Sequence, residues 1–209
     1  MNQVILKETK PSEALSTKSG AYREVLQHVH VREAVIFAAF YWGIMATILY
    51  CLVPLMLQKL GFNAFGTVLA ATNLLCFFGA KPAAELSDRL GRKAVLLPSM
   101  SFVALAALLL PSVFSAQRHE AALLTLFLGA LAIGQALVGP ALPAIFTDRL
   151  KPKLHTEALS LLRISTEVGA VTLSLSMSFM VGSLGFTVPL MLAGVAALAS
   201  ALRFSRRYP

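Results

Sequence analysis

Long stretches without any Asp, Glu, Lys or Arg limit what this chain can fold into. These stretches cover residues 34–58, 60–80, 94–117, 121–147 and 168–202. A helix needs about 20 apolar residues to cross a hydrocarbon layer of about 30 Å, so each of the first four stretches is long enough for one crossing. The last stretch is long enough for two crossings, because Gly182, Gly185 and Pro189 mark a turn inside it.

Composition agrees with a membrane environment. Of the 209 residues, 57% are hydrophobic and only 13% are charged, which leaves too few polar side chains to cover the outside of a soluble protein of this size. Helices buried in a soluble bundle would also show a polar stripe, and these stretches do not. We therefore predict an all-α, polytopic membrane protein with six transmembrane helices. They are expected at about 34–56, 65–86, 94–114, 121–146, 159–181 and 185–203.

The positions of Lys and Arg predict which ends of these helices share one side of the membrane. If both termini are cytoplasmic, fifteen of the eighteen basic residues fall in cytoplasmic segments and two, Lys59 and Arg118, fall outside, while Lys81 lies within a span. Such a bias is typical of a polytopic protein with an even number of spans. We expect a cytoplasmic polar leader or linker at 1–33, the six-helix bundle at 34–204 and a cytoplasmic tail at 205–209.

Charge gathers between the second and third predicted spans, in the sequence ELSDRLGRKAV at 85–95. With its flanks, this segment resembles the signature of the major facilitator superfamily, G-x-L-a-D-R-x-G-R-K, although Ala84 replaces the first Gly. Gly91 allows a tight turn, and the basic residues favour the cytoplasmic face. The matching positions that carry charge or form the turn are Asp88, Arg89, Gly91, Arg92 and Lys93.

The connection between the fourth and fifth predicted spans matches a second outline of the same family. There an acidic residue ends the fourth helix, a basic loop follows, and an Arg and an acidic residue open the fifth. Asp148, Arg163 and Glu167 stand at these places, and the last two are four residues apart, so they share a helix face and can pair. Leu128 replaces the Arg that often leads the fourth helix of the first half, so the chain is more similar to the C-terminal half.

The resemblance implies a function and a set of site residues. It implies one six-helix half, or a fragment, of a secondary transporter that moves a small solute by alternating access and needs a second half or a homodimer, because the family uses twelve spans. The alternative is a non-transporting membrane subunit or sensor with a transporter-like fold. The residues implied to latch the halves in one state are Asp88, Arg89, Gly91, Arg92, Lys93, Asp148, Arg163 and Glu167.

Polar side chains inside the predicted spans are candidates for the substrate pathway, since such groups usually face protein or a cavity. Lys81 has two interpretations: it reaches the interface from within its helix, which is the favoured one, or its charge is coupled to substrate or conformational state. The candidates are Tyr41, Trp42, Asn73, Lys81 and Gln135.

Other functional classes have little support in the sequence. All four His residues, at 28, 30, 119 and 155, lie outside the predicted spans, so an intramembrane protease with a His base is not expected. The sequence contains neither a Gly-rich phosphate loop nor a zinc motif, so we expect no enzyme activity, cofactor or metal. The basic residues flank membrane-spanning helices, where they face lipid, and therefore do not indicate nucleic acid.

Overall fold

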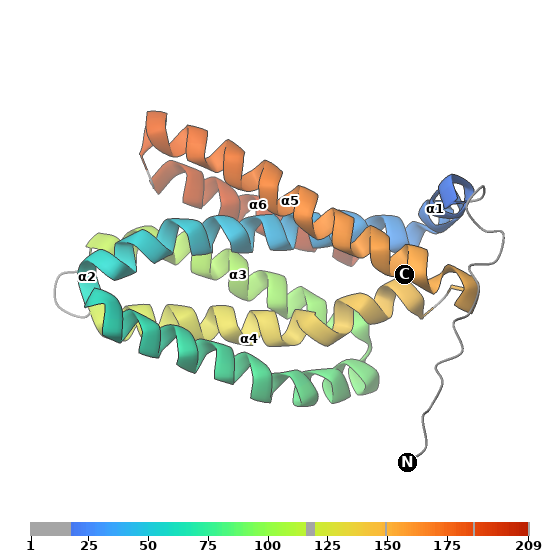
Figure 1. The fold of residues 1–209 in the computed structure, drawn as a ribbon, viewed down its shortest axis with the longest axis horizontal. Coiled ribbons are helices and arrows are strands. Elements are labelled where there is room, and N and C mark those ends of the chain that lie inside the picture. Colours follow the sequence, from blue (N-terminus) through green and yellow to red (C-terminus); the bar gives the residue numbers. More distant parts are fainter. Residues whose placement is uncertain (1–17, 116–119, 149, 186, 209) are drawn as a thin grey trace, which may run out of the picture.

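The computed structural model describes residues 18–115, 120–148, 150–185 and 187–208, without the side chains of 18–19, 50–64, 68, 112–115 and 120–126. Within this part of the chain the fold is helical and contains no strand, which confirms the predicted all-α class. Figure 1 shows the helices packed lengthwise as one bundle. The helices are α1 (Lys18–Gln27), α2 (Val29–Leu90), α3 (Arg92–Ser115), α4 (Glu120–Thr147), η1 (Pro152–Leu154), α5 (His155–Leu184) and α6 (Thr187–Arg207).

Among the described residues, six segments are long and apolar enough to cross a membrane, as predicted. The first two predicted spans, 34–56 and 65–86, fall within the single element α2. They correspond to a first half, Val29–Leu49, and a second half, Phe65–Leu90, which run in opposite directions in Figure 1. Helices α4 to α6 extend a few residues beyond the predicted spans, and α6 takes in residues 205–207 of the predicted tail. Of the predicted leader, residues 1–17 lie outside the described residues.

Two glycines with positive φ angles end helices. Gly91, at φ +89°, separates α2 from α3, and Gly185, at φ +72°, ends α5 and donates its backbone N–H to the carbonyl of Val181 at 3.0 Å. A side chain is strained in this region of φ, so Gly is the residue that allows both turns. The Gly91 turn was expected from the charged motif around it.

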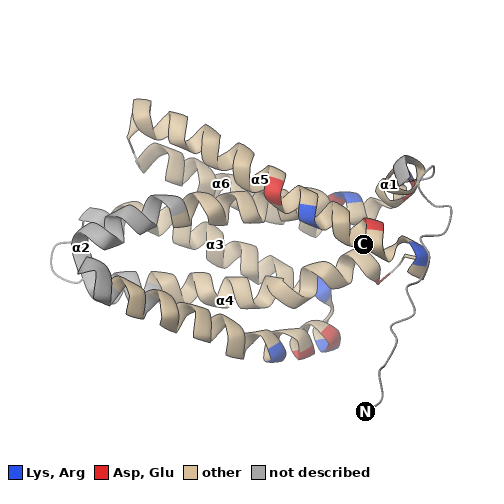
Figure 2. Ribbon diagram, viewed as in Figure 1, with Lys and Arg blue, Asp and Glu red and all other residues tan. Residues whose placement is uncertain are grey.

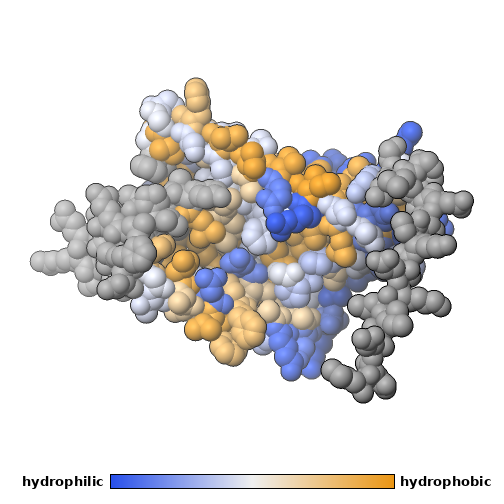
Figure 3. Space-filling model, in the orientation of Figure 1, coloured by the Kyte–Doolittle hydropathy of each residue, from blue (hydrophilic) through white to orange (hydrophobic). Residues whose placement is uncertain are grey.

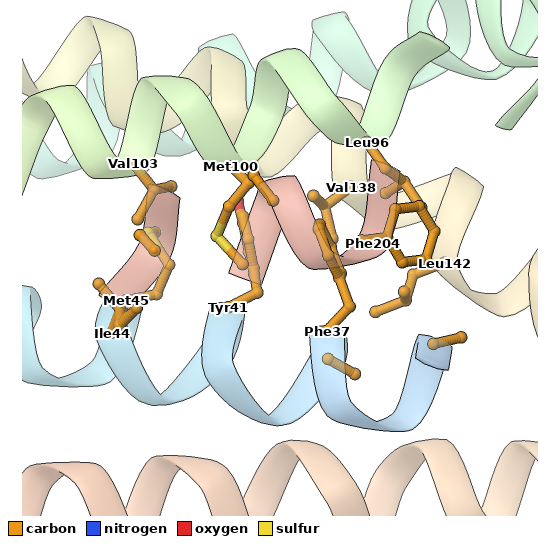
Figure 4. Close-up of a cluster of buried hydrophobic side chains, with 14 of the residues drawn as sticks. Phe37, Tyr41, Ile44, Met45, Leu96, Met100, Val103, Val138, Leu142 and Phe204 are labelled. Atoms are coloured by element: carbon orange, nitrogen blue, oxygen red, sulfur yellow. The ribbon is translucent and has the colours of Figure 1, made fainter. Parts of the chain in front are cut away.

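The core forms around the first half of α2. Phe37, Tyr41, Ile44 and Ile48 are fully buried and recur at spacings of three and four residues, so they lie on one side of this helix. Figure 4 shows Phe37, Tyr41 and Ile44 facing residues of the neighbouring helices, and the ring centroids of Phe37 and Phe204 lie 4.8 Å apart. The core residues of other helices that Figure 4 labels are Leu96, Met100, Val103, Val138, Leu142 and Phe204.

One end of the bundle collects most of the charged side chains, as Figure 2 shows. Three contacts bring distant parts of the chain together there: Glu33 with Arg203, Arg92 with Asp148, and Lys93 with the backbone carbonyl of Tyr208. We call this the charged end. It contains both ends of α2, the start of α3, the end of α4 and the end of α6. The predicted basic turns at 89–93 and near 148 therefore lie on the same side of the bundle.

Candidate functional site

A cluster of polar side chains surrounds Arg92 where α2 turns into α3. Its Nη1 lies 2.5 Å from Asp88 Oδ1 and donates to Ser87 Oγ at 3.0 Å, while its Nε donates to Asp148 Oδ2 at 3.0 Å. Asp88 comes from the last turn of α2, and Asp148 follows α4. The structure thus brings together three of the predicted latch residues, in an arrangement that ties the α2–α3 turn to the end of α4. We call Arg92, Asp88, Ser87 and Asp148 the Arg92 cluster.

The two carboxylates of this cluster are open to solvent, whereas Ser87 is buried and Arg92 is only partly exposed. The side chains of Asp88 and Asp148 are 63% and 42% exposed, and that of Arg92 is 22% exposed. Because water can replace the partners of exposed charges, such pairs contribute little to stability and can be exchanged at low cost. Arg92 also holds two carboxylates at once through different nitrogens, and so links the end of α2 to the residue that follows α4.

The other residues of the predicted latch motif have different positions. Arg89 is exposed at the end of α2. Lys93 is partly buried and donates its Nζ to the carbonyl of Tyr208 at 2.9 Å, so it connects α3 to the end of α6. Gly91 supplies the turn between Arg89 and Lys93. The motif therefore serves two contacts, one to α4 through Arg92 and one to α6 through Lys93.

Arg163 and Glu167 form an ion pair on α5, with 2.6 Å between Arg163 Nη2 and Glu167 Oε1. Both side chains are exposed. Figure 2 shows charged positions along α5. Arg163 and Glu167 line a cavity and are not part of the Arg92 cluster. The predicted ion pair is present, and it forms part of the wall of this cavity.

The cavity has a volume of about 530 Å³ and is formed by the first half of α2, α4 and α5. Its walls are mainly apolar, and its polar groups come from α5 apart from the indole of Trp42. Figure 3 shows hydrophilic surface beside hydrophobic surface on this face of the molecule. Residues that line it include Trp42, Met45, Leu49, Leu142, Leu159, Arg163, Thr166 and Glu167. Such a mixture can hold a small amphiphilic molecule, whose polar group would meet α5.

The predicted pathway residues do not form one site. Trp42 lines the cavity, but Tyr41 is fully buried in the core with its ring beside Phe37. On the second half of α2, Asn73 is exposed and donates to its own helix at the carbonyl of Leu69. Lys81 is also exposed there.

Gln135 of α4 is partly buried, and its Oε1 lies 3.7 Å from the Cys76 thiol of α2. It thus joins two helices instead of lining the cavity.

A buried carboxylate that the sequence analysis did not single out connects the start of α2 to the end of α6. Glu33, at the start of α2, has a side chain that is only 1% exposed, and it accepts hydrogen bonds from Arg203 Nε at 2.9 Å and Nη2 at 3.3 Å. Arg207 Nη1 lies 3.9 Å from Glu33 Oε1, the oxygen that also accepts from Arg203 Nη2. We call Glu33, Arg203 and Arg207 the Glu33 cluster. The sequence contained one indication of this cluster: Arg203 and Arg207 are four residues apart, so they share one face of a helix and can bind the same acidic group.

The described residues include no group of three or more His, Cys, Asp or Glu side chains placed to hold a metal ion. The sites described above consist of ion pairs, hydrogen bonds and apolar walls. These groups can bind a solute and respond to a change of conformation.

Comparison with family models gives one match, to the Major Facilitator Superfamily, over residues 34–209. This range contains all six membrane-spanning segments apart from the first five residues of α2. Neither the comparison with curated proteins nor the comparison with solved structures gave a match.

Proposed function

Since the chain belongs to the major facilitator superfamily, a family of transporters and not of enzymes, we propose that it forms one half of a secondary transporter. It moves a small solute by alternating access, in which two six-helix units rock against each other around a central site. The second unit is either another six-helix segment or a second copy of this chain.

The uneven burial of the membrane-spanning segments is the observation that carries this proposal. In an apolar stretch of 18 residues taken from each segment, only 6% of the residues from the second half of α2 and 17% of those from the α5 segment are buried, against 44–61% for the other four segments. Large apolar side chains stand out from both, with Phe77 at 73% exposed and Phe179 at 83%. A second unit seated against these two helices would cover them and close the cavity beside α5. Lipid tails alone would cover the apolar side chains but would offer no polar partner to Arg163 and Glu167 in the cavity wall.

Chemistry of the cavity supports a solute with an apolar body and a polar group. Trp42 and the neighbouring leucines supply contact area, while the exposed pair of Arg163 and Glu167 supplies charge-assisted hydrogen bonds. In a low-dielectric environment these bonds orient a solute more strongly than they would in water. The second unit provides the opposite wall.

We place the Arg92 cluster in the conformational change. In one state Arg92 bridges Asp88 and Asp148, as in the structure, and in the other the bridge opens when the two units rock. Its exposure to water keeps the cost of this exchange low. The charged end faces the cytoplasm, because basic residues concentrate there.

The test is assembly followed by transport. The purified chain is examined by native mass spectrometry, and uptake is then measured in liposomes that contain it alone or with a six-helix partner from the same source. We expect a dimer or a complex, with uptake only in the assembled form. Phe77→Ala with Phe179→Ala should weaken assembly, whereas Leu105→Ala, at an exposed position on α3, should not.

A monomer that transports at full rate would contradict the proposal. Stable assembly without uptake of any solute from a broad panel would instead favour a non-transporting subunit with a transporter-like fold. The two outcomes separate the claim about architecture from the claim about transport.

A further inference from the structure

A second cavity lies between the first half of α2 and α6. The cavity described above, formed by the first half of α2, α4 and α5, is here called the solute cavity, and the two cavities have only α2 in common. The second cavity has a volume of about 270 Å³ and contains none of the residues that line the solute cavity. Its walls are apolar apart from one serine, with large side chains from α2 and small ones from α6, and one arginine lies at one end. The lining residues are Ile36, Phe40, Ala196, Ala199, Ser200 and Arg203. We call it the α2–α6 slot.

Positive charge gathers at the end of the slot marked by Arg203. The Arg203 side chain stays 45% exposed although it binds Glu33, and Arg207 is 61% exposed beside it. Arg32 also acts electrostatically on Glu33. Two guanidinium groups, those of Arg203 and Arg207, therefore contact one carboxylate, and that carboxylate is buried. The mouth of the slot presents net positive charge to whatever lies outside it.

The slot runs from the charged end toward the middle of the membrane. Arg203 belongs to the last turns of α6, and Ala196 lies seven residues earlier, which is about 10 Å along a helix axis. Its polar end is thus at the membrane boundary and its apolar end within the hydrocarbon layer. A soluble anion would use only the mouth, whereas a molecule with an anionic head and an apolar tail would fill the whole slot.

We propose that the α2–α6 slot binds one anionic phospholipid. Its phosphate contacts Arg203 and Arg207, and the first part of an acyl chain lies against Phe40, Ala196 and Ala199. The arrangement matches basic pockets between membrane helices, which favour anionic head groups. The bound lipid would shield the Glu33 cluster from the side, and the proposal does not depend on whether the chain transports a solute.

The first experiment compares two lipids with identical acyl chains. Phosphatidylglycerol or phosphatidylcholine is added to the purified full chain, and bound lipid is counted by native mass spectrometry. We expect phosphatidylglycerol to bind at least about tenfold more tightly, because two arginines contact its charge without a compensating choline. Equal binding of the two lipids would overturn the proposal.

Slot-filling variants locate the bound lipid. Ala199→Phe puts a ring into the slot and should remove the preference for phosphatidylglycerol, while the matched control Leu198→Phe, at an exposed neighbouring position outside the slot, should keep it. If both variants bind as the unaltered chain does, the lipid is elsewhere and the proposal fails.

Variants at the mouth test the charge. Arg203→Gln should lower phosphatidylglycerol affinity about fivefold or more, which is the contribution expected of one arginine near a membrane surface. This change alone leaves the buried Glu33 carboxylate without its main partner and could impair folding. The double variant Glu33→Gln with Arg203→Gln avoids this, because it places two neutral hydrogen-bonding side chains at these positions. Unchanged affinity in a folded double variant would contradict the proposal.

Inorganic phosphate distinguishes a lipid from a free anion. A site built for both head and tail should keep phosphatidylglycerol bound when millimolar phosphate is added. Displacement of the lipid by phosphate would show that the mouth alone is the site, and would overturn the assignment to a phospholipid.

Discussion

The two halves of α2 are both apolar, but they differ in how much of each is buried by neighbouring helices. Val29–Leu49 and Phe65–Leu90 both qualify as membrane-spanning segments, yet in an apolar stretch of 18 residues from each, 61% of the first and 6% of the second is buried in the bundle. The first half packs against α3, α4, α5 and α6, whereas the second half contacts α4 along one side. Hydropathy thus identifies a helix that prefers lipid to water, but the neighbours decide whether it becomes the centre of a bundle or an open face.

The clusters at the ends of these two halves differ in the same way. At the start of the first half the central group is a buried carboxylate, Glu33, held by two arginines. At the end of the second half the central group is Arg92, and its carboxylate partners are open to water. Removing a partner from a buried charge is costly, whereas exposed charges can be rehydrated. The contact at the start of the first half is therefore costly to break, whereas the contact at the end of the second half costs less to break.

The largest expected effect tests the difference in packing. Phe37→Ala should lower the free energy of unfolding by about 3 kcal/mol, because it leaves a cavity in the core, while Phe77→Ala should change it by less than about 0.5 kcal/mol. Thermal or denaturant unfolding of the purified chain in detergent measures both. Equal losses would mean that the second half of α2 is packed as tightly as the first.

The next effect contrasts the two clusters. Arg203→Gln should lower the unfolding temperature by several degrees, because it leaves the Glu33 carboxylate with only Arg207 at 3.9 Å. Arg92→Gln should lower it less, since water can reach Asp88 and Asp148. Both variants are compared by thermal unfolding in the same detergent.

A double variant separates the loss of an attraction from the burial of an unpaired charge. Glu33→Gln combined with Arg203→Gln should recover part of the stability lost in Arg203→Gln, because no buried charge remains. If the double variant is less stable than either single variant, the pair does not act as a unit and the contrast between the clusters is lost.

A smaller effect tests how closely the first half of α2 approaches α5. A methyl group at Gly169 would collide with the backbone of Ala39, and one at Gly43 would lie 2.5 Å from the Gly169 carbonyl. Gly169→Ala should therefore cost about 1–3 kcal/mol through overpacking. Gly182→Ala, on the same helix but with nothing within 4 Å, should stabilise the chain by up to about 1 kcal/mol. The same sign for both changes would contradict this close contact.

Much of the fold could be predicted because its determinants are local. The uncharged runs predicted six spans, and the basic turns predicted that several helix ends lie on one side. The i,i+4 spacing of Arg163 and Glu167 predicted their ion pair, and the charged motif predicted a turn at Gly91.

The rest depends on contacts between distant segments. Glu33 and Arg203 are 170 positions apart, and the sequence around either residue does not indicate that it contacts the other. Tyr41 was expected to face a pathway because of its hydroxyl, but its ring packs in the core with Phe37 and Trp42. Arg163 and Glu167 pair as expected, yet only the arrangement of α4 and α5 places them at the cavity.

The smallest structural effect has the clearest functional consequence. Asp88→Asn should change the unfolding temperature little, because the side chain is 63% exposed, but it removes one of the two charges that hold Arg92. We expect slower solute uptake by the assembled transporter, with unchanged solute binding, since the cavity residues are not altered. Asp148→Asn is the matched variant at the other partner of Arg92 and should act in the same direction. Binding and uptake are measured separately in liposomes. If both variants transport at the normal rate, the Arg92 cluster is a static anchor at the membrane boundary, and the two halves of α2 differ in packing but not in mobility.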